Sequence, residues 1–279
     1  MPSRFLDPAD VKRQEERRFD FNRKSLAGRV VLIPGGIGGL GSAIVALLLQ
    51  EGALPVVGYR SNRGRALVFQ QNMQDLYGGP VRLVEGDVAD AEARKRYLEA
   101  ALGVKGEIFG LVALTGDPAR VKPADLDGPA LAASFRANFE APVLLARAGA
   151  EAMRAKGTRG AIVLLSSMQG THPFEGSLAY ASPKAALVHA ARILAKEYGG
   201  TPDIRVNVVA PGATSAGMAR ASIEAGKYDA YVERGVIPRF GRPEDVARAV
   251  RFFLEPDSYT TGQVMTVDGG LTLRRDRLA

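Results

Sequence analysis

Short apolar runs alternate with longer, helix-patterned segments along most of the chain. Seven of these runs are almost continuously apolar and rich in β-branched side chains, which is typical of strands buried on both faces of a parallel sheet. Each run is bounded by glycine, proline or polar residues and has the length of a strand. The predicted strands are Val30–Ile33, Leu54–Tyr59, Val81–Glu85, Gly110–Leu114, Ala161–Ser166, Arg205–Val209 and Gln263–Val267.

Helical patterns fall between these strands, with neither an internal repeat nor a low-complexity linker. The unbroken series favours the α/β class and a single doubly wound Rossmann domain, with a parallel seven-stranded sheet and helices on both faces. We predict this domain over residues 26–279, preceded by a charged N-terminal arm, residues 1–25, that lacks a sustained apolar period. The predicted helices include Ser42–Leu49, Ala91–Leu102, Pro129–Met153, Pro183–Tyr198 and Pro243–Leu254.

Five glycines stand within the seven residues that follow the first predicted strand and Pro34. Gly36, Gly38 and Gly41 fit G-x-G-x-x-G, whereas Gly35, Gly39 and Gly41 fit G-x-x-x-G-x-G. Where a strand turns sharply into a helix, glycines let a pyrophosphate approach backbone N–H groups and the positive end of the helix. The alternative is a glycine-rich turn that only packs the strand against the helix.

Polar residues follow the second and third predicted strands, at the edge of the sheet where ligands bind in folds of this kind. Tyr59 stands where an enzyme that selects a free 2′-hydroxyl places Asp or Glu, and Arg60 and Ser61 come next. A guanidinium can hold a 2′-phosphate bidentately, although a solvated basic loop is the alternative. After the third strand, Asp87 could accept from an adenine amino group, with Val88 beside the ring, or Asp87 could cap the next helix.

A serine and a Tyr–Lys pair follow the fifth predicted strand. Ser167 lies in "LLSSMQG", and Tyr180 and Lys184 lie in "YASPKAAL", four residues apart on one face of a predicted helix. A tyrosine hydroxyl with a pKa near 10 is a poor proton shuttle at neutral pH. A neighbouring ammonium favours the phenolate, so this spacing predicts a proton donor with a lowered pKa. Taken alone, such a pair is more often surface decoration.

These motifs together resemble those of the short-chain dehydrogenase/reductase family over residues 26–273, and are similar to those of 3-oxoacyl-[acyl-carrier-protein] reductases and glucose dehydrogenases. The segments "RVNVVAPG" and "SYTTGQVMTVDGG" add to the resemblance. Epimerase-like relatives use another glycine spacing, and divergent enoyl reductases place six residues between Tyr and Lys, so neither pattern fits. The family spacing favours Gly35, Gly39 and Gly41. The resemblance implies a catalytic set of Asn138, Ser167, Tyr180 and Lys184.

The resemblance also implies the reaction, which is a hydride transfer between the cofactor and a carbonyl or secondary alcohol. We expect this cofactor to be NADP(H) rather than NAD(H). Tyr180 would donate the proton in reduction, and Lys184 would contact the nicotinamide ribose and lower the pKa of Tyr180. Ser167 would orient the carbonyl, and Asn138 would hold a water that relays protons. The implied cofactor-binding residues are Gly35, Gly39, Leu40, Gly41, Tyr59, Arg60, Ser61, Asp87, Val88, Ala113, Thr115, Gly116, Tyr180, Lys184, Pro211, Gly212 and Thr214.

Three positions depart from the family's pattern. Pro34 replaces a threonine, "ALTG" at residues 113–116 replaces N-N-A-G, and Ala216 stands where a threonine is usual. The first two changes remove side-chain tethers between loops, so we expect weaker cofactor affinity with catalysis retained. They also leave an alternative, a catalytically weak or inactive nucleotide-binding structural or regulatory subunit of the same fold. The sequence leaves the substrate open, and the loop Ala213–Pro238 is expected to select it.

The composition of the chain argues against several kinds of binding site and partner. The chain has no cysteine and two histidines, so we expect no metal site. No apolar run approaches the roughly 20 residues of a membrane span, and the charged N-terminal sequence is unlike a signal peptide, so we expect a cytoplasmic protein without a membrane partner. The net charge is +7, but residues 1–25 and 273–279 contribute +2 each, so only +3 is left on the central part of the chain. This small excess argues against a nucleic-acid partner. In the family that the chain resembles, helices pair between subunits, which implies a homotetramer or homodimer.

Overall fold

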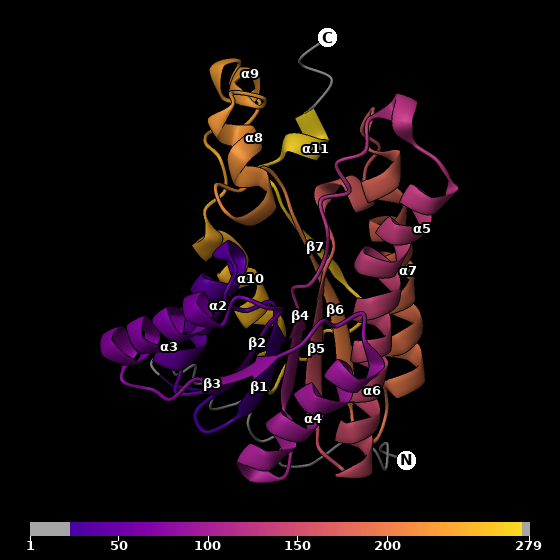
Figure 1. Ribbon diagram of the computed structural model, residues 1–279. Coiled ribbons are helices and arrows are strands. Elements are labelled where there is room, and N and C mark those ends of the chain that lie inside the picture. Colours follow the sequence, from indigo (N-terminus) through magenta and orange to yellow (C-terminus); the bar gives the residue numbers. More distant parts are fainter. Residues whose placement is uncertain (1–22, 275–279) are drawn as a thin grey trace, which may run out of the picture.

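The computed structural model describes residues 23–274, which form a seven-stranded sheet with helices on both faces (Figure 1). The strand order is β3-β2-β1-β4-β5-β6-β7, and every neighbouring pair is parallel. The order of strands reverses between β1 and β4, which places the topological switch point at their carboxyl ends. The predicted fold class is confirmed. The strands are β1 Val30–Pro34, β2 Leu54–Tyr59, β3 Arg82–Glu85, β4 Gly110–Ala113, β5 Gly160–Leu165, β6 Ile204–Pro211 and β7 Val264–Val267.

The predicted arm, residues 1–25, lies outside the described residues except for 23–25. The described part of the predicted domain begins at Leu26, which is fully buried. Within residues 23–274, no helix has the length and hydropathy needed to cross a membrane. The same residues contain no group of three or more side chains that could hold a metal ion.

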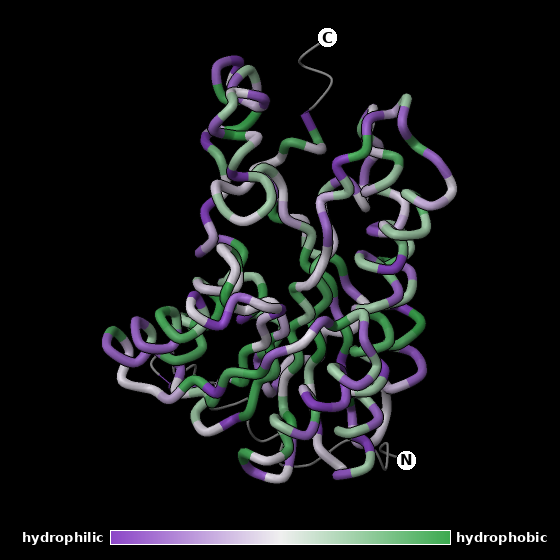
Figure 2. Tube along the Cα trace, in the orientation of Figure 1, coloured by the Kyte–Doolittle hydropathy of each residue, from purple (hydrophilic) through white to green (hydrophobic). Residues whose placement is uncertain are grey.

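Two apolar layers hold the helices to the sheet. One layer packs α4, α6 and α7 against one face, and the other packs α2, α3 and α10 against the opposite face (Figure 1). Hydrophobic residues accordingly concentrate along the strands in the interior (Figure 2). The helices are α2 Gly39–Gln50, α3 Arg63–Tyr77, α4 Ala91–Lys105, α5 Gly128–Phe135, α6 Ala141–Ala155, α7 Leu178–Tyr198, α8 Arg220–Glu224, α9 Asp229–Glu233, α10 Pro243–Phe253 and α11 Leu271–Arg274.

Residues 129–153 are helical as predicted, but the helix is not regular, because a π-helical turn, Arg136–Glu140, separates α5 from α6. Pro142 lies in the first turn of α6 and has no N–H to bond the carbonyl of Asn138. The regular i to i−4 ladder is therefore interrupted at Asn138, and the wider turn forms there. Such π-turns inside helices are frequent at functional sites.

Two further helices differ from the expectation. The helix α7 begins at Leu178, five residues before the predicted start, and Pro183 lies inside it. The helix α3 was not among the predicted helices, because Leu67, Val68 and Leu76 are exposed and obscure its buried face.

Candidate active site

Five glycines form the turn from β1 into α2, and the backbone geometry shows which of them must be glycine. Gly35 has a φ of 81°, in the left-handed region that favours glycine. A Cβ on Gly39 would lie 2.6 Å from the nitrogen of Gly217, and a Cβ on Gly41 would collide with the main chain earlier in the turn. A Cβ on Gly38 would meet only a carbonyl oxygen at 3.3 Å. A Cβ on Gly36 would also collide, 2.8 Å from the Val57 side chain, so Gly38 alone separates the two spacings, and its free space favours Gly35-x-x-x-Gly39-x-Gly41.

The first turn of α2 has the shape and polarity that a pyrophosphate needs. The N-cap residue, Gly38, has no side chain that could accept from the amide groups of the first turn of α2. Thr115 lies beside Gly35, and its Oγ1 is buried without a hydrogen-bond partner in the described part of the chain. The open amide groups and the buried hydroxyl both fit a dinucleotide at this turn.

The departures at Pro34 and Leu114 leave the ends of β1 and β4 joined through the main chain alone. Pro34 pairs with Gly58 in the sheet, and its carbonyl accepts a long hydrogen bond, 3.4 Å, from the Leu114 nitrogen. A Cβ on Gly35 would lie 3.5 Å from Leu114, so the two loops are in ordinary van der Waals contact. The loops thus pack together without the side-chain tethers that Thr and Asn residues would add.

Predicted residues after β4 and β6 border the same region. Ala113 ends the buried strand β4, and Pro211 ends β6. A Cβ on Gly212 would lie 2.6 Å from the Cβ of Asp268, so this backbone position has no room for a side chain. Thr214 is buried, and its hydroxyl donates to the carbonyl of Gly212 at 3.2 Å.

Tyr59 has a partner that the sequence interpretation missed. Its hydroxyl donates to a carboxylate oxygen of Glu85 at 3.0 Å, and the two residues face each other in the parallel register of β2 and β3. Tyr59 is almost fully buried, and its pKa is raised by burial and by hydrogen bonding to Glu85. Arg60 and Ser61 are exposed just beyond it. The sequence places both residues at the ends of strands, but their pairing depends on the register of β2 and β3.

Asp87 does not cap the following helix, so that alternative is wrong. Asp90 is the N-cap of α4 and accepts from the Glu92 nitrogen, whereas the Asp87 carboxylate accepts from the Ala89 nitrogen in a local turn. Val88 is buried in the apolar layer beneath α4. The predicted adenine contact of Asp87 is left as a prediction.

The end of β5 and the first turns of α7 bring Ser167, Tyr180 and Lys184 together. Ser167 follows β5 and begins a short 3₁₀ turn, accepting from the Gln169 nitrogen. Tyr180 and Lys184 both lie on α7, as their spacing predicts, and the Lys184 Nζ lies 5.8 Å from the centre of the Tyr180 ring. The Tyr180 hydroxyl also interacts with the Ser167 side chain by hydrogen bonding.

Lys184 is buried and fixed at both its ends. Its ammonium donates to the carbonyl of Leu165 at 2.9 Å, and its own carbonyl accepts from the Ser166 hydroxyl at 2.9 Å. The side chain is 2% exposed, and burial lowers the pKa of Lys184 to about 8. The pair of hydrogen bonds ties α7 to the end of β5.

Asn138 connects three segments around the same lysine. Its Oδ1 accepts from the Asp117 nitrogen at 3.0 Å, and its Nδ2 donates to Ser134, whose hydroxyl donates to the carbonyl of Ala179. A Cβ on Gly116 would lie 2.8 Å from the Asn138 Oδ1 and 3.2 Å from the Lys184 Nζ. The loop after β4, the π-turn and α7 therefore meet at one point, where only glycine fits.

The expected lowering of the Tyr180 pKa is wrong in this arrangement. Burial raises the pKa of Tyr180 to about 12, although hydrogen bonding with Ser167 acts in the opposite direction, and the nearby Tyr228 hydroxyl raises the pKa further. The raised pKa comes mainly from burial of the hydroxyl, while the Lys184 ammonium donates to the carbonyl of Leu165. Tyr180 is therefore protonated at neutral pH.

Comparison with known proteins identifies the family. A family model described as enoyl-(acyl carrier protein) reductase matches residues 35–272. A tropinone reductase homologue from Arabidopsis thaliana is 31% identical over 264 residues, covering 90% of this chain and 95% of the relative. The 3-oxoacyl-[acyl-carrier-protein] reductase FabG of Thermotoga maritima is 31% identical over 252 residues, covering 89% of this chain and 99% of the relative.

The solved structure of a short-chain type dehydrogenase/reductase from Mycobacterium ulcerans superimposes with a TM-score of 0.83 and 28% identity, covering 89% of this chain and 91% of that structure. The chain belongs to the short-chain dehydrogenase/reductase family. The resemblance inferred from the sequence motifs is confirmed, and with it the assignment as an oxidoreductase.

The glycine geometry generates a paired test. Gly39→Ala should abolish detectable nucleotide binding and lower the melting temperature, because its Cβ meets the main chain of the loop after β6. Gly38→Ala should bind nucleotide within a few-fold of the parent and melt close to it, because its φ of −75° suits any residue. Equilibrium binding of NADPH by fluorescence, with thermal melting of both variants, measures these effects. Equal losses in both variants would contradict the assigned spacing.

Proposed function

We propose that this chain transfers a hydride between NADP(H) and the carbonyl or secondary alcohol of a small-molecule substrate. The observation that carries the proposal is the meeting of Asn138, Ser167, Tyr180 and Lys184 at the carboxyl end of β5, beside the glycine turn. Two of the relatives described above are named as reductases of ketone substrates, which supports a carbonyl.

A dinucleotide whose pyrophosphate is held at the glycine turn would supply the hydride from its nicotinamide. The protein's residues orient the substrate and move the proton. Ser167 holds the substrate oxygen near the Tyr180 hydroxyl, and Tyr180 donates its proton to that oxygen as negative charge develops there. The Tyr180 hydroxyl is protonated at neutral pH, as the proton donor of a reduction must be. Lys184 would hold the nicotinamide ribose, and the Asn138 network fixes the lysine's surroundings.

The matching family model is described as an enoyl reductase, but the reaction proposed here is the reduction of a carbonyl. Tyr180 and Lys184 lie four positions apart on α7, which is the spacing of the carbonyl-reducing members. The alternative function, an inactive nucleotide-binding subunit, is motivated by Pro34 and Leu114, whose loops pack through the backbone alone. The complete catalytic set favours an active enzyme over that alternative.

Replacing the proposed proton donor tests the reaction. Tyr180→Phe should reduce turnover of a carbonyl substrate, found with a panel of ketones and aldehydes, by at least a hundredfold, because it removes the donated proton. NADPH binding should change little. The control is Tyr259→Phe, which removes the hydroxyl of a fully exposed tyrosine far from the site and should leave turnover unchanged. Turnover by Tyr180→Phe within a few-fold of the parent would refute the mechanism, and no turnover by the parent on the whole panel would favour the inactive subunit.

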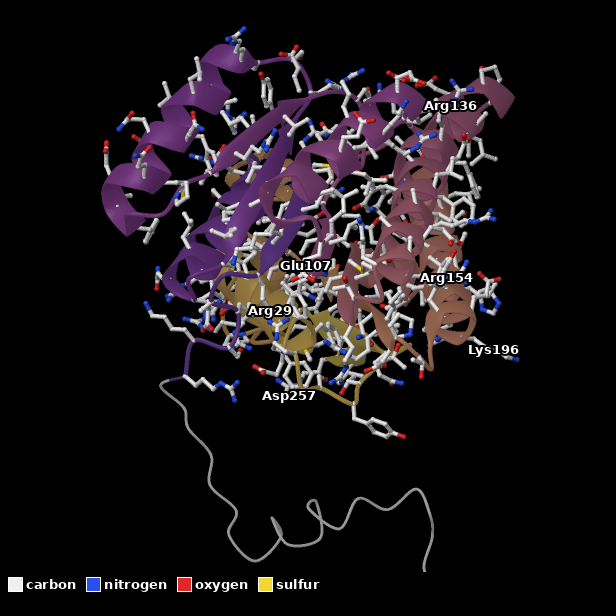
Figure 3. The ribbon with its side chains drawn as sticks, turned by 90° about the horizontal axis from the view of Figure 1, so that it is seen from below. Arg29, Glu107, Arg136, Arg154, Lys196 and Asp257 are labelled. Atoms are coloured by element: carbon white, nitrogen blue, oxygen red, sulfur yellow. The ribbon has the colours of Figure 1, made fainter. Side chains whose placement is uncertain are left out.

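We also propose that NADP(H) is preferred, because Arg60 directly follows Tyr59 at the end of β2 and is exposed. A charge-assisted contact with a 2′-phosphate is worth about 1.5–3 kcal/mol, or roughly ten- to a hundredfold in affinity. Arg60→Ala should therefore weaken NADPH by that factor and NADH by much less. Lys196→Ala, at the distant end of α7, removes a charge without reaching the cofactor site and is the control (Figure 3). Tighter binding of NADH than of NADPH by the parent would overturn the preference.

We propose that the protein is a homodimer or homotetramer that pairs through the outer faces of α6 and α7. Leu144 and Ile193 are exposed there, and the groove between the helices carries both acidic and arginine side chains, so a two-fold related copy could complement it. Sedimentation equilibrium at micromolar concentration should find no monomer, and Ile193→Glu should shift the protein toward smaller species. A monomeric parent protein would refute the assembly.

A further inference from the structure

A carboxylate lies beside the segment that is proposed to bind the adenosine ribose. Glu85 ends β3, and its carboxylate accepts the proton of the Tyr59 hydroxyl, which ends β2. Glu85 itself is exposed, whereas Tyr59 is 7% exposed. The Tyr59 hydroxyl is therefore turned toward β3 and engaged, so it cannot donate the same proton to a ribose or phosphate oxygen.

Three arginines share this edge with Glu85. Arg63 lies close enough to Tyr59 to lower its pKa, against the raising effect of Glu85. The guanidinium of Arg65 lies 3.4 Å from the carbonyl oxygen of Ile37, inside the glycine turn. Arg60 is exposed and precedes Arg63 by three residues. The adenosine end of the site is thus bordered by cationic groups from the β2–α3 segment and by one carboxylate from β3.

We propose that Glu85 is a specificity-determining residue for the cofactor, whose carboxylate opposes the attraction of the arginines for a 2′-phosphate. This inference rests on the proposed function. The protein then binds NAD(H) and NADP(H) with affinities closer to each other than Arg60 and Arg63 alone would give. The end of β2 has no acidic residue, and the neighbouring strand supplies a carboxylate at the tip of the Tyr59 side chain.

The physical reason is the charge difference between the two nucleotides. A 2′-phosphate carries up to two negative charges at this edge, and a 2′-hydroxyl carries none, so a fixed carboxylate here disfavours the nucleotide with the 2′-phosphate more than the one without it. Glu85 is solvent-exposed, and salt therefore screens its effect. For a partly screened interaction across one side chain, we expect a two- to fivefold change in affinity when the charge is removed.

The test is the substitution Glu85→Gln, which removes the charge and keeps an oxygen that can accept from Tyr59. Calorimetry should show that this variant binds 2′,5′-ADP two- to fivefold more tightly than the parent, while its affinity for 5′-AMP is unchanged. The gain should shrink in high salt. The control is Glu107→Gln, which removes an exposed carboxylate just before β4, at the opposite end of the sheet, and should change neither affinity (Figure 3).

Several results would overturn the inference. They are equal changes for 2′,5′-ADP and 5′-AMP, no change in either, a gain by Glu107→Gln of the same size, or no binding of 2′,5′-ADP to either protein. These readouts use nucleotide fragments and need no substrate. If the predicted gain appears but no carbonyl is turned over with either dinucleotide, then the proposed reaction fails while the role of Glu85 stands.

Discussion

The tie between the end of β5 and α7 is the interaction on which the site depends. Lys184 reaches back to the Leu165 carbonyl, and the Ser166 hydroxyl reaches forward to the Lys184 carbonyl, so the strand end and the helix are fixed in both directions. Gly170 makes this approach possible, because a Cβ there would lie 2.5 Å from the Ser166 Oγ and 2.7 Å from the Lys184 carbonyl carbon. Ser167 and Tyr180 are the residues directly positioned by this close packing.

A second close approach joins the glycine turn to the loop after β6. Gly39 lies against Gly217, and Arg120, from the loop after β4, donates to the carbonyl of Met218 at 3.2 Å. The segment expected to select the substrate is therefore in contact with both the glycine turn and the loop that carries Gly116. Changes in this segment, even those aimed at the substrate, act on the surroundings of the cofactor as well.

Much of this arrangement could be predicted from the sequence, because the strands are buried on both faces and the catalytic spacing is local. The four-residue step from Tyr180 to Lys184 needs only a helix to become a shared face. What could not be predicted depends on contacts between distant segments. The hydrogen bond from Tyr59 to Glu85 requires the register of two strands, and the π-turn at Asn138 depends on a missing amide at Pro142. The pKa of Tyr180 is set mainly by the burial of its hydroxyl, which the spacing to Lys184 does not reveal.

The burial of Lys184 has a thermodynamic consequence for the whole protein. In the unfolded chain its pKa is the ordinary value of 10.5, and in the folded protein it is about 8, so the unfolded chain binds this proton more tightly. Between pH 8 and 10.5 the free energy of unfolding therefore rises with pH through this residue, and below pH 8 the full penalty is present. At roughly 1.4 kcal/mol for each unit of pKa, that penalty is a sizeable part of the 5–15 kcal/mol by which a typical domain is stable. The fold therefore carries this penalty at neutral pH and below, where Lys184 is charged.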